Sequence, residues 1–90
     1  MVSQRVQEAR ALSELSQRDL DRLAGLSEGH VGMIESGRRE NLEASTASRI
    51  AKVLGMTLEW LIDGTGEGPT PAKVRRAVAS ARNAAARKVA

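Results

Sequence analysis

The sequence contains no cysteine, and Trp60 is its only aromatic residue besides His30. Without cysteine the chain has neither a disulfide framework nor a thiolate metal site. A single histidine also excludes a multi-histidine metal site, so we expect neither a metal nor a cofactor. The lack of Phe and Tyr argues against RNA and single-strand binders, which stack bases on such rings.

Long apolar runs are also missing from the sequence. No run approaches the roughly 20 residues that cross a bilayer, and the first residues lack the apolar stretch of a secretory signal. We therefore expect a soluble, cytoplasmic protein that makes no use of a membrane. The 90 residues have room for one small domain. Such a body offers little space for a catalytic cleft and shows no oriented Ser-His-Asp relay, so we expect no enzyme.

Acidic residues are absent from residues 69–90, which makes the charge uneven. This segment carries +6, while residues 1–68 hold the other eight basic residues with all 11 acidic ones and carry −3. A basic tail on a mildly acidic body indicates an anionic partner, most often nucleic acid, and a tail that only aids solubility is the alternative. The candidate phosphate contacts of the tail are Lys73, Arg75, Arg76, Arg82, Arg87 and Lys88.

The spacing of apolar residues predicts a series of short helices. We expect them at residues 4–13, 17–24, 28–36, 45–54 and 58–62. Ser16 and Ser27 are good N-caps for the second and third helices. Because Gly25 ends the second helix and only Leu26 precedes Ser27, one helix ends and the next begins within three residues. Such a short connection predicts a helix-turn-helix.

Glycine and proline are concentrated in residues 64–71, a composition typical of a linker. The chain is thereby divided into a domain at residues 1–63, this linker, and an alanine-rich basic tail at residues 72–90. We expect the tail to be helical, or to be disordered alone and to fold along DNA phosphates. A thin apolar stripe, typical of a helix seam, is formed by Val74, Val78, Ala81, Ala85 and Val89.

An ordered set of motifs covers residues 4–64. Its members are Leu15-Ser16-Gln17, Leu20, Ala24-Gly25-Leu26-Ser27, Val31, Ile34-Glu35, Gly37, Arg39, Ile50-Ala51, Leu54-Gly55 and Leu58-Glu59-Trp60-Leu61-Ile62-Asp63-Gly64. This set resembles the phage-repressor/Cro (XRE-type) helix-turn-helix family. The resemblance implies an all-α fold, a five-helix lambda-repressor-like domain that binds double-stranded DNA, usually as a dimer on a palindromic operator. We therefore expect a sequence-specific transcription regulator, most simply a repressor that acts as a homodimer.

The third helix is expected to enter the major groove, which is about 12 Å wide and admits one helix. Val31 and Ile34 define its buried side, so the residues opposite and beside them face the bases. Two of these are glycines, so we expect modest direct readout, with more specificity from backbone contacts and DNA shape. The base-facing candidates are Glu28, Gly29, His30, Gly32, Met33 and Ser36.

Other candidates are expected at DNA phosphates. Gln17 and Arg18 open the helix that lies over the backbone in this motif. Arg38 and Arg39 follow the recognition helix directly, and the resemblance points to Gln17, Ser27, Arg38 and Arg39 as backbone contacts.

The resemblance further implies an ion pair between Arg10 and Glu35. In the family this pair joins the first and third helices and lets the arginine reach a phosphate; the alternative is two independent surface charges. Asp21 departs from the family pattern, which usually has alanine at this close approach of two helices. A carboxylate here needs solvent or a partner, for which Arg18 and Arg22 are the candidates.

Several candidates have structural alternatives. Glu28 could favour the helix dipole instead of reading cytosine, His30 could be a core residue, and Met33 could be an exposed apolar residue. Trp60 is expected in the core, with a subunit interface as the alternative. The dimer interface is expected at the fifth helix or on the apolar stripe of the tail.

Two other functions are compatible with the same domain. One is an antitoxin-type autoregulator whose tail binds a toxin. The other is a protein-interaction adaptor that has kept the fold, which the small glycine-containing face and the −3 charge of residues 1–68 would suit.

Overall fold

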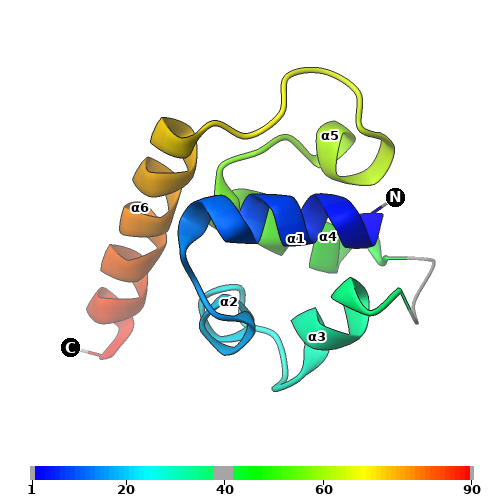
Figure 1. Ribbon diagram of the computed structural model, residues 1–90. Helices are drawn as coiled ribbons and strands as arrows, with labels where there is room; N and C mark the ends of the chain where they lie inside the picture. The colour runs from blue at the N-terminus through cyan, green and yellow to red at the C-terminus, as the bar shows by residue number, and fades with distance from the viewer. Residues whose placement is uncertain (1, 38–41, 90) are drawn as a thin grey trace.

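The computed structural model describes residues 2–37 and 42–89, and all regular structure within them is helical (Figure 1). The side chains of residues 88 and 89 are not described. The predicted all-α class is confirmed. The helices are α1 (Val2–Ser13), α2 (Gln17–Leu23), α3 (His30–Glu35), α4 (Ala44–Leu54), α5 (Leu58–Asp63) and α6 (Pro71–Val89).

The predicted bounds of the helices hold to within one or two residues, and the largest shift at a functional position is at α3. This helix begins at His30 and not at Glu28, because Gly29 has a φ of 86°, outside the helical range. Ser27 was expected to be the N-cap of this helix, and that prediction is wrong, because Gly29 occupies the N-cap position.

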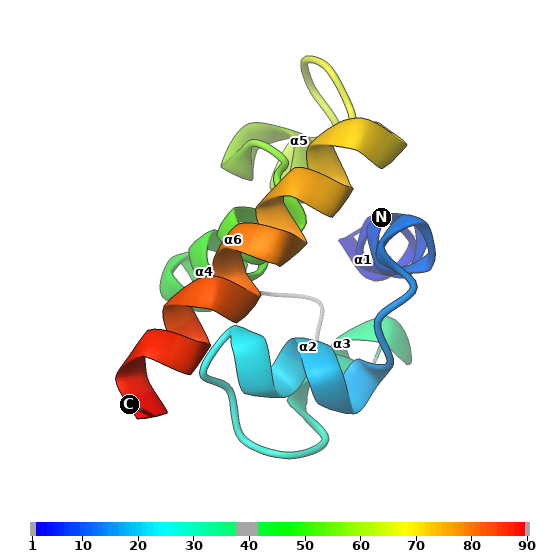
Figure 2. The same cartoon turned by 90° about the vertical axis from the view of Figure 1, so that its left-hand side faces the viewer.

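The core lies between α1, α4 and α5; α2 and α3 close it on one side and α6 closes it on another (Figures 1 and 2). Apolar side chains at helical spacing fill it, as the sequence pattern predicts. Trp60 belongs to this core, in agreement with the structural expectation. The largest fully buried side chains are those of Leu20, Ile34, Ile50, Leu54, Leu61, Val6, Val31 and Val74.

The basic tail forms α6, which packs along α4 and also contacts α1 and α2 (Figure 2). Val74 and Val78 are buried in the common core, so the first half of the apolar stripe is covered by the chain itself. Gly55 permits the close approach: a Cβ atom there would lie 2.8 Å from the Cβ of Ala77 and 2.8 Å from the carbonyl oxygen of Lys73.

The connection between α5 and α6 also packs on the body. Gly68 lies so close to the indole of Trp60 that an added Cβ would be 2.9 Å from its Nε1. Thr70 then caps α6, since the amide of Lys73 donates to its hydroxyl at 3.2 Å. Across residues 2–37 and 42–89, no helix combines the length and apolar character that crossing a membrane requires.

Candidate nucleic-acid interface

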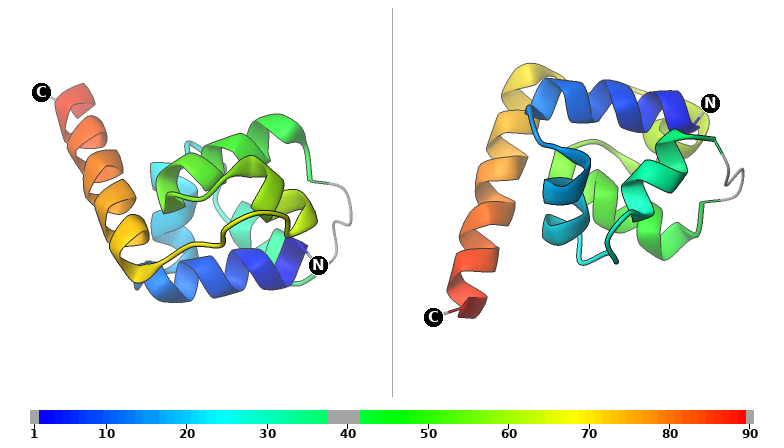
Figure 3. Two further views of the ribbon diagram at one scale, coloured as in Figure 1. Left: turned by 90° about the horizontal axis from the view of Figure 1, so that it is seen from above. Right: turned by 60° about the horizontal axis from the view of Figure 1, so that its bottom comes forward.

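The helix pair α2 and α3 is built from strong local signals. Ser16 caps α2 as expected, since its hydroxyl accepts a hydrogen bond of 3.0 Å from the amide of Asp19. After Leu23 the chain turns, and the amide of Leu26 donates to the carbonyl of Asp21 at 2.8 Å. The turn is therefore closed by the backbone, and α3 leaves it at a fixed angle to α2 (Figure 3).

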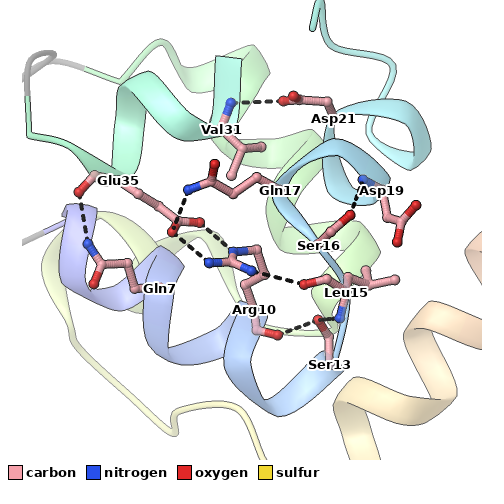
Figure 4. Close-up of polar contacts among 10 residues, drawn as sticks. All are labelled: Gln7, Arg10, Ser13, Leu15, Ser16, Gln17, Asp19, Asp21, Val31 and Glu35. Carbon is pink, nitrogen blue, oxygen red and sulfur yellow. Dashed lines mark hydrogen bonds and ion pairs between the residues drawn. The ribbon is translucent and has the colours of Figure 1, made fainter. Parts of the chain in front are cut away.

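Asp21 joins the two helices of this pair. Its carboxylate accepts from the amide of Gly29 at 2.9 Å and from that of Val31 at 2.8 Å, and the residue is only 3% exposed. These amides open α3, where backbone N–H groups lack helical partners and a negative charge is favourable. Asp21 thus performs the capping that was expected of Ser27 (Figure 4).

The predicted partners of Asp21 were wrong. Arg18 lies 2.6 Å from Glu28, and Arg22 lies 3.7 Å from Asp19. Two neutral backbone amides therefore satisfy the buried carboxylate, and Asp21 links α2 to the start of α3.

Arg10 and Glu35 form the ion pair that the resemblance implies. Nε of Arg10 donates to Oε2 of Glu35 at 2.7 Å, and a second guanidinium nitrogen donates to Oε1 at 3.0 Å. The hydrogen bond to Glu35 raises the pKa of Arg10 above its ordinary value; burial opposes this shift and the attraction of the carboxylate adds to it. Such two-point geometry is the strong form of an arginine–carboxylate contact.

Glu35 is the centre of a wider network (Figure 4). Its side chain is 6% exposed, and its Oε1 also accepts from Nε2 of Gln17 at 3.2 Å. Its backbone carbonyl accepts from the amide side chain of Gln7 at 2.8 Å, while Arg10 also donates to the carbonyl of Leu15 at 3.0 Å. The network therefore ties α1 and the start of α2 to the end of α3.

The outward face of α3 and the residues that flank this helix carry most of the predicted base-facing residues. Val31 and Ile34 are buried, whereas Met33 is 44% exposed and Gly29 and Ser36 are also exposed. His30 is half-buried. The helix therefore offers one side to the exterior while the other side is held by the core.

Gly32 differs from its expected role as part of an open face. It is half-buried, and a Cβ atom there would lie 3.2 Å from Oε1 of Gln17. The Gln17 side chain folds over α3 at this point and donates to Glu35. Gly32 thus makes room for Gln17, and the open face is narrower than the sequence predicts.

Two other candidates lie at the edge of this face and pair with each other. Arg18 and Glu28 form an exposed ion pair of 2.6 Å, and Ser27 beside them is exposed. An exposed pair contributes little stability, typically about 0–1 kcal/mol. Either partner is therefore available to a ligand at small cost. Arg38 and Arg39, expected at phosphates, lie outside the described residues.

The cations of the tail are spread along α6 and are not brought together. Lys73 lies 3.3 Å from Glu67 at the start of the helix, and Arg75 and Arg76 are exposed nearby. Arg82 and Arg87 lie toward the end of α6, which extends to the side of the molecule where α2 and α3 lie (Figures 1 and 3). The side chain of Lys88 is not described.

Comparison with known proteins agrees with this geometry. Residues 6–61 match a family model described as "Helix-turn-helix". The match begins in α1 and ends in α5, so it includes the α2–α3 pair and more than half of the chain. No curated protein and no solved structure matches the chain.

Proposed function

The chain belongs to the XRE-type helix-turn-helix family of DNA-binding transcription regulators, and we propose that it is a sequence-specific repressor that binds a palindromic operator as a homodimer. The observation that carries the proposal is the outward face of α3: Met33 and Ser36 are exposed, while Val31 and Ile34 anchor the helix from behind. A helix presented in this way fits the width of the major groove.

The proposed readout combines few base contacts with a rigid backbone fit. Met33 is suited to a thymine methyl group, and Ser36 to either hydrogen-bonding edge. Because Gly29 adds no side chain and Gly32 is covered by Gln17, the remaining specificity comes from DNA shape and deformability. The networks at Asp21 and Glu35 support this readout by fixing the angle at which α3 enters the groove.

Phosphate contacts are proposed for the residues that border α3. Arg18 can exchange its exposed contact with Glu28 for a phosphate, a change that leaves Glu28 free to face the bases. Ser27 and Gln17 lie beside them, and we propose the same role for Arg38 and Arg39. Such contacts position the protein on the duplex and carry no sequence information by themselves.

Dimerisation is proposed because a single small domain makes few contacts, whereas two can read half-sites about 34 Å apart. The surface around α5 is the better candidate for the interface. Ile62 is 37% exposed there, whereas Val74 and Val78 of the alternative stripe are already buried in their own chain. A dimer that covers a promoter would block polymerase sterically.

Selection of bound duplexes from random DNA tests this proposal. The expected result is enrichment of an inverted repeat whose half-sites are centred about 10 base pairs apart. A parallel selection with Met33→Ala should enrich the same spacing with weaker base preference at one position of each half-site. Recovery of random sequence alone from the unmodified protein would contradict the proposal.

A further inference from the structure

A groove lies where the second half of α6 leaves the body. It has a volume of about 700 Å³, and it is bordered by the end of α2, one side of α4 and the alanine face of α6. None of the residues that line it belongs to α3. The groove is therefore separate from the proposed DNA-reading face and does not depend on that proposal.

The floor and the rim of the groove differ in chemistry. The floor is apolar and made of small or aliphatic side chains, among them Leu23, Val53 and Ala81. The rim carries three cations: Arg22, Arg49 and Lys52. Arg22 is 3.7 Å from Asp19 and Arg49 donates to the carbonyl of Gly25 at 3.3 Å, whereas Lys52 has no ion-pair partner among the described residues.

The groove continues the seam that already binds α6 to the body. Val74 and Val78 are buried, Ala81 is half-buried, and Ala84 and Ala85 are exposed on the same side of the helix. The described part of this open stretch, residues 81–87, spans about 10 Å at 1.5 Å per residue, or two helical turns. The small side chains of the wall leave room for larger apolar side chains from a partner helix.

We propose that this groove binds an amphipathic helix of another protein, whose apolar side chains fill the floor and whose acidic residues meet Arg22, Arg49 and Lys52. The charge of the rim favours this occupant over α6 of a second copy. A second copy's α6 would bring Arg82 and Arg87 toward a rim of the same sign, and like charges at an interface oppose association. The apolar floor in turn favours a protein helix over DNA, whose phosphates would leave Leu23 and Val53 without apolar partners.

The test uses the full-length protein and two synthetic 14-residue peptides labelled with fluorescein. Both peptides place leucine at helical i, i+3 and i+4 positions; one carries glutamate on the flanking positions and the other carries lysine. Fluorescence anisotropy should show saturable binding of the glutamate peptide that weakens as salt is raised. Equal binding of the two peptides, or no binding of the glutamate peptide, would overturn the proposal.

Variants locate the binding site. The double substitution Lys52→Glu and Arg49→Glu should lower the affinity for the glutamate peptide by about tenfold or more. Arg75→Glu, on the opposite side of α6, is the matched control and should leave its affinity within about twofold. Ala84→Leu keeps every charge, and leucine is nearly as good a helix former as alanine. Its larger side chain should fill the groove and block peptide binding. Circular dichroism of each variant checks that α6 remains folded, and unchanged affinity in folded Ala84→Leu would refute the site.

Two further outcomes are decided by the same reagents. If duplex DNA displaces the glutamate peptide, and Lys52→Glu lowers the affinity for DNA as much as the affinity for the peptide, the groove is a DNA site and the proposal fails. If sedimentation shows a dimer that Ala84→Leu dissolves, the occupant is a second copy and the proposal also fails. Operator binding that persists while Ala84→Leu abolishes peptide binding would support two independent faces.

Discussion

The carboxylate of Asp21 accepts a hydrogen bond of 2.8 Å from the backbone amide of Val31, across the turn between α2 and α3. Through the same side chain the amide of Gly29 is held at 2.9 Å. One buried residue of α2 thus caps α3. The relative position of these two helices depends on hydrogen bonds from backbone amides to a side chain as well as on apolar packing.

Replacement of Asp21 by alanine should destabilise the domain by about 1–3 kcal/mol, because two amides at the start of α3 lose a charged acceptor. Urea denaturation measures the change. Asp19→Ala is the matched control: this residue lies two positions away and forms only the exposed contact with Arg22, so its loss should cost less than about 1 kcal/mol. Equal effects of the two substitutions would show that the capping contact has no energetic role.

Arg10 and Glu35 should couple strongly in a double-mutant cycle. Arg10→Ala leaves a nearly buried carboxylate with Gln17 as its remaining side-chain partner, and loss of one member of such a pair costs about 3–5 kcal/mol. Removing both residues should cost less than the sum of the single changes. The exposed pair of Arg18 and Glu28 is the control, with an expected coupling below about 1 kcal/mol; similar coupling in both pairs would contradict the prediction.

Gly55→Ala should destabilise the protein more than Gly66→Ala. Both glycines have positive φ, 73° and 82°, so both substitutions meet the same backbone strain of roughly 1–2 kcal/mol. Only at Gly55 does the new Cβ meet α6, at 2.8 Å from Ala77 and Lys73, whereas the space around Gly66 is open. Chemical denaturation should therefore show a further loss of about 1–3 kcal/mol for Gly55→Ala, with earlier proteolysis of α6. Equal losses would mean that the helix approach is not tight.

Met33→Ala should reduce operator affinity without changing stability. The side chain is 44% exposed, and surface substitutions usually change the free energy of unfolding by less than about 0.5 kcal/mol. Titration with the selected operator should show weaker binding by about 1–3 kcal/mol, while affinity for unrelated duplexes stays unchanged. Glu8→Ala, on the exposed side of α1, serves as control. Loss of affinity for all duplexes alike would argue against a base contact.

The end of α6 should add to the salt dependence of DNA binding. Deletion of residues 69–90 cannot test this cleanly, since Val74 and Val78 belong to the core. The double substitution Arg82→Gln and Arg87→Gln should instead make the negative slope of log K against log salt less steep by about two units. Arg75→Gln with Arg76→Gln, near the other end of the helix, should change it by less than one. If the first pair leaves the slope unaltered, the tail does not contact phosphate.

Local signals made the helix-turn-helix predictable. Ser16, Gly25 and the apolar spacing of Val31 and Ile34 act within a few residues of one another, and such short-range rules can be read from a sequence. The ion pair of Arg10 and Glu35 joins residues 25 positions apart, and only the family resemblance pointed to it.

Contacts that depend on the assembled backbone were not predictable in this way. Asp21 accepts hydrogen bonds from two main-chain amides. Almost every residue has such an amide, so no residue type in the sequence identifies the partners. The contact of Gln7, which donates to the carbonyl of Glu35, is not predictable for the same reason. Along the α6 stripe, burial falls from Val74 and Val78, which are buried, to Ala85, which is exposed. This change likewise depends on where α6 leaves α4, a property of tertiary packing.

Trp60 gives the protein a built-in optical probe. It is the only tryptophan, it is largely buried, and Gly68 of the connection to α6 lies against its indole. Separation of this segment from the body, for example on unfolding, would expose the ring to water and should move its emission to longer wavelength. Packing and detachment of α6 and its connection can thus be followed by intrinsic fluorescence, without labelling the chain.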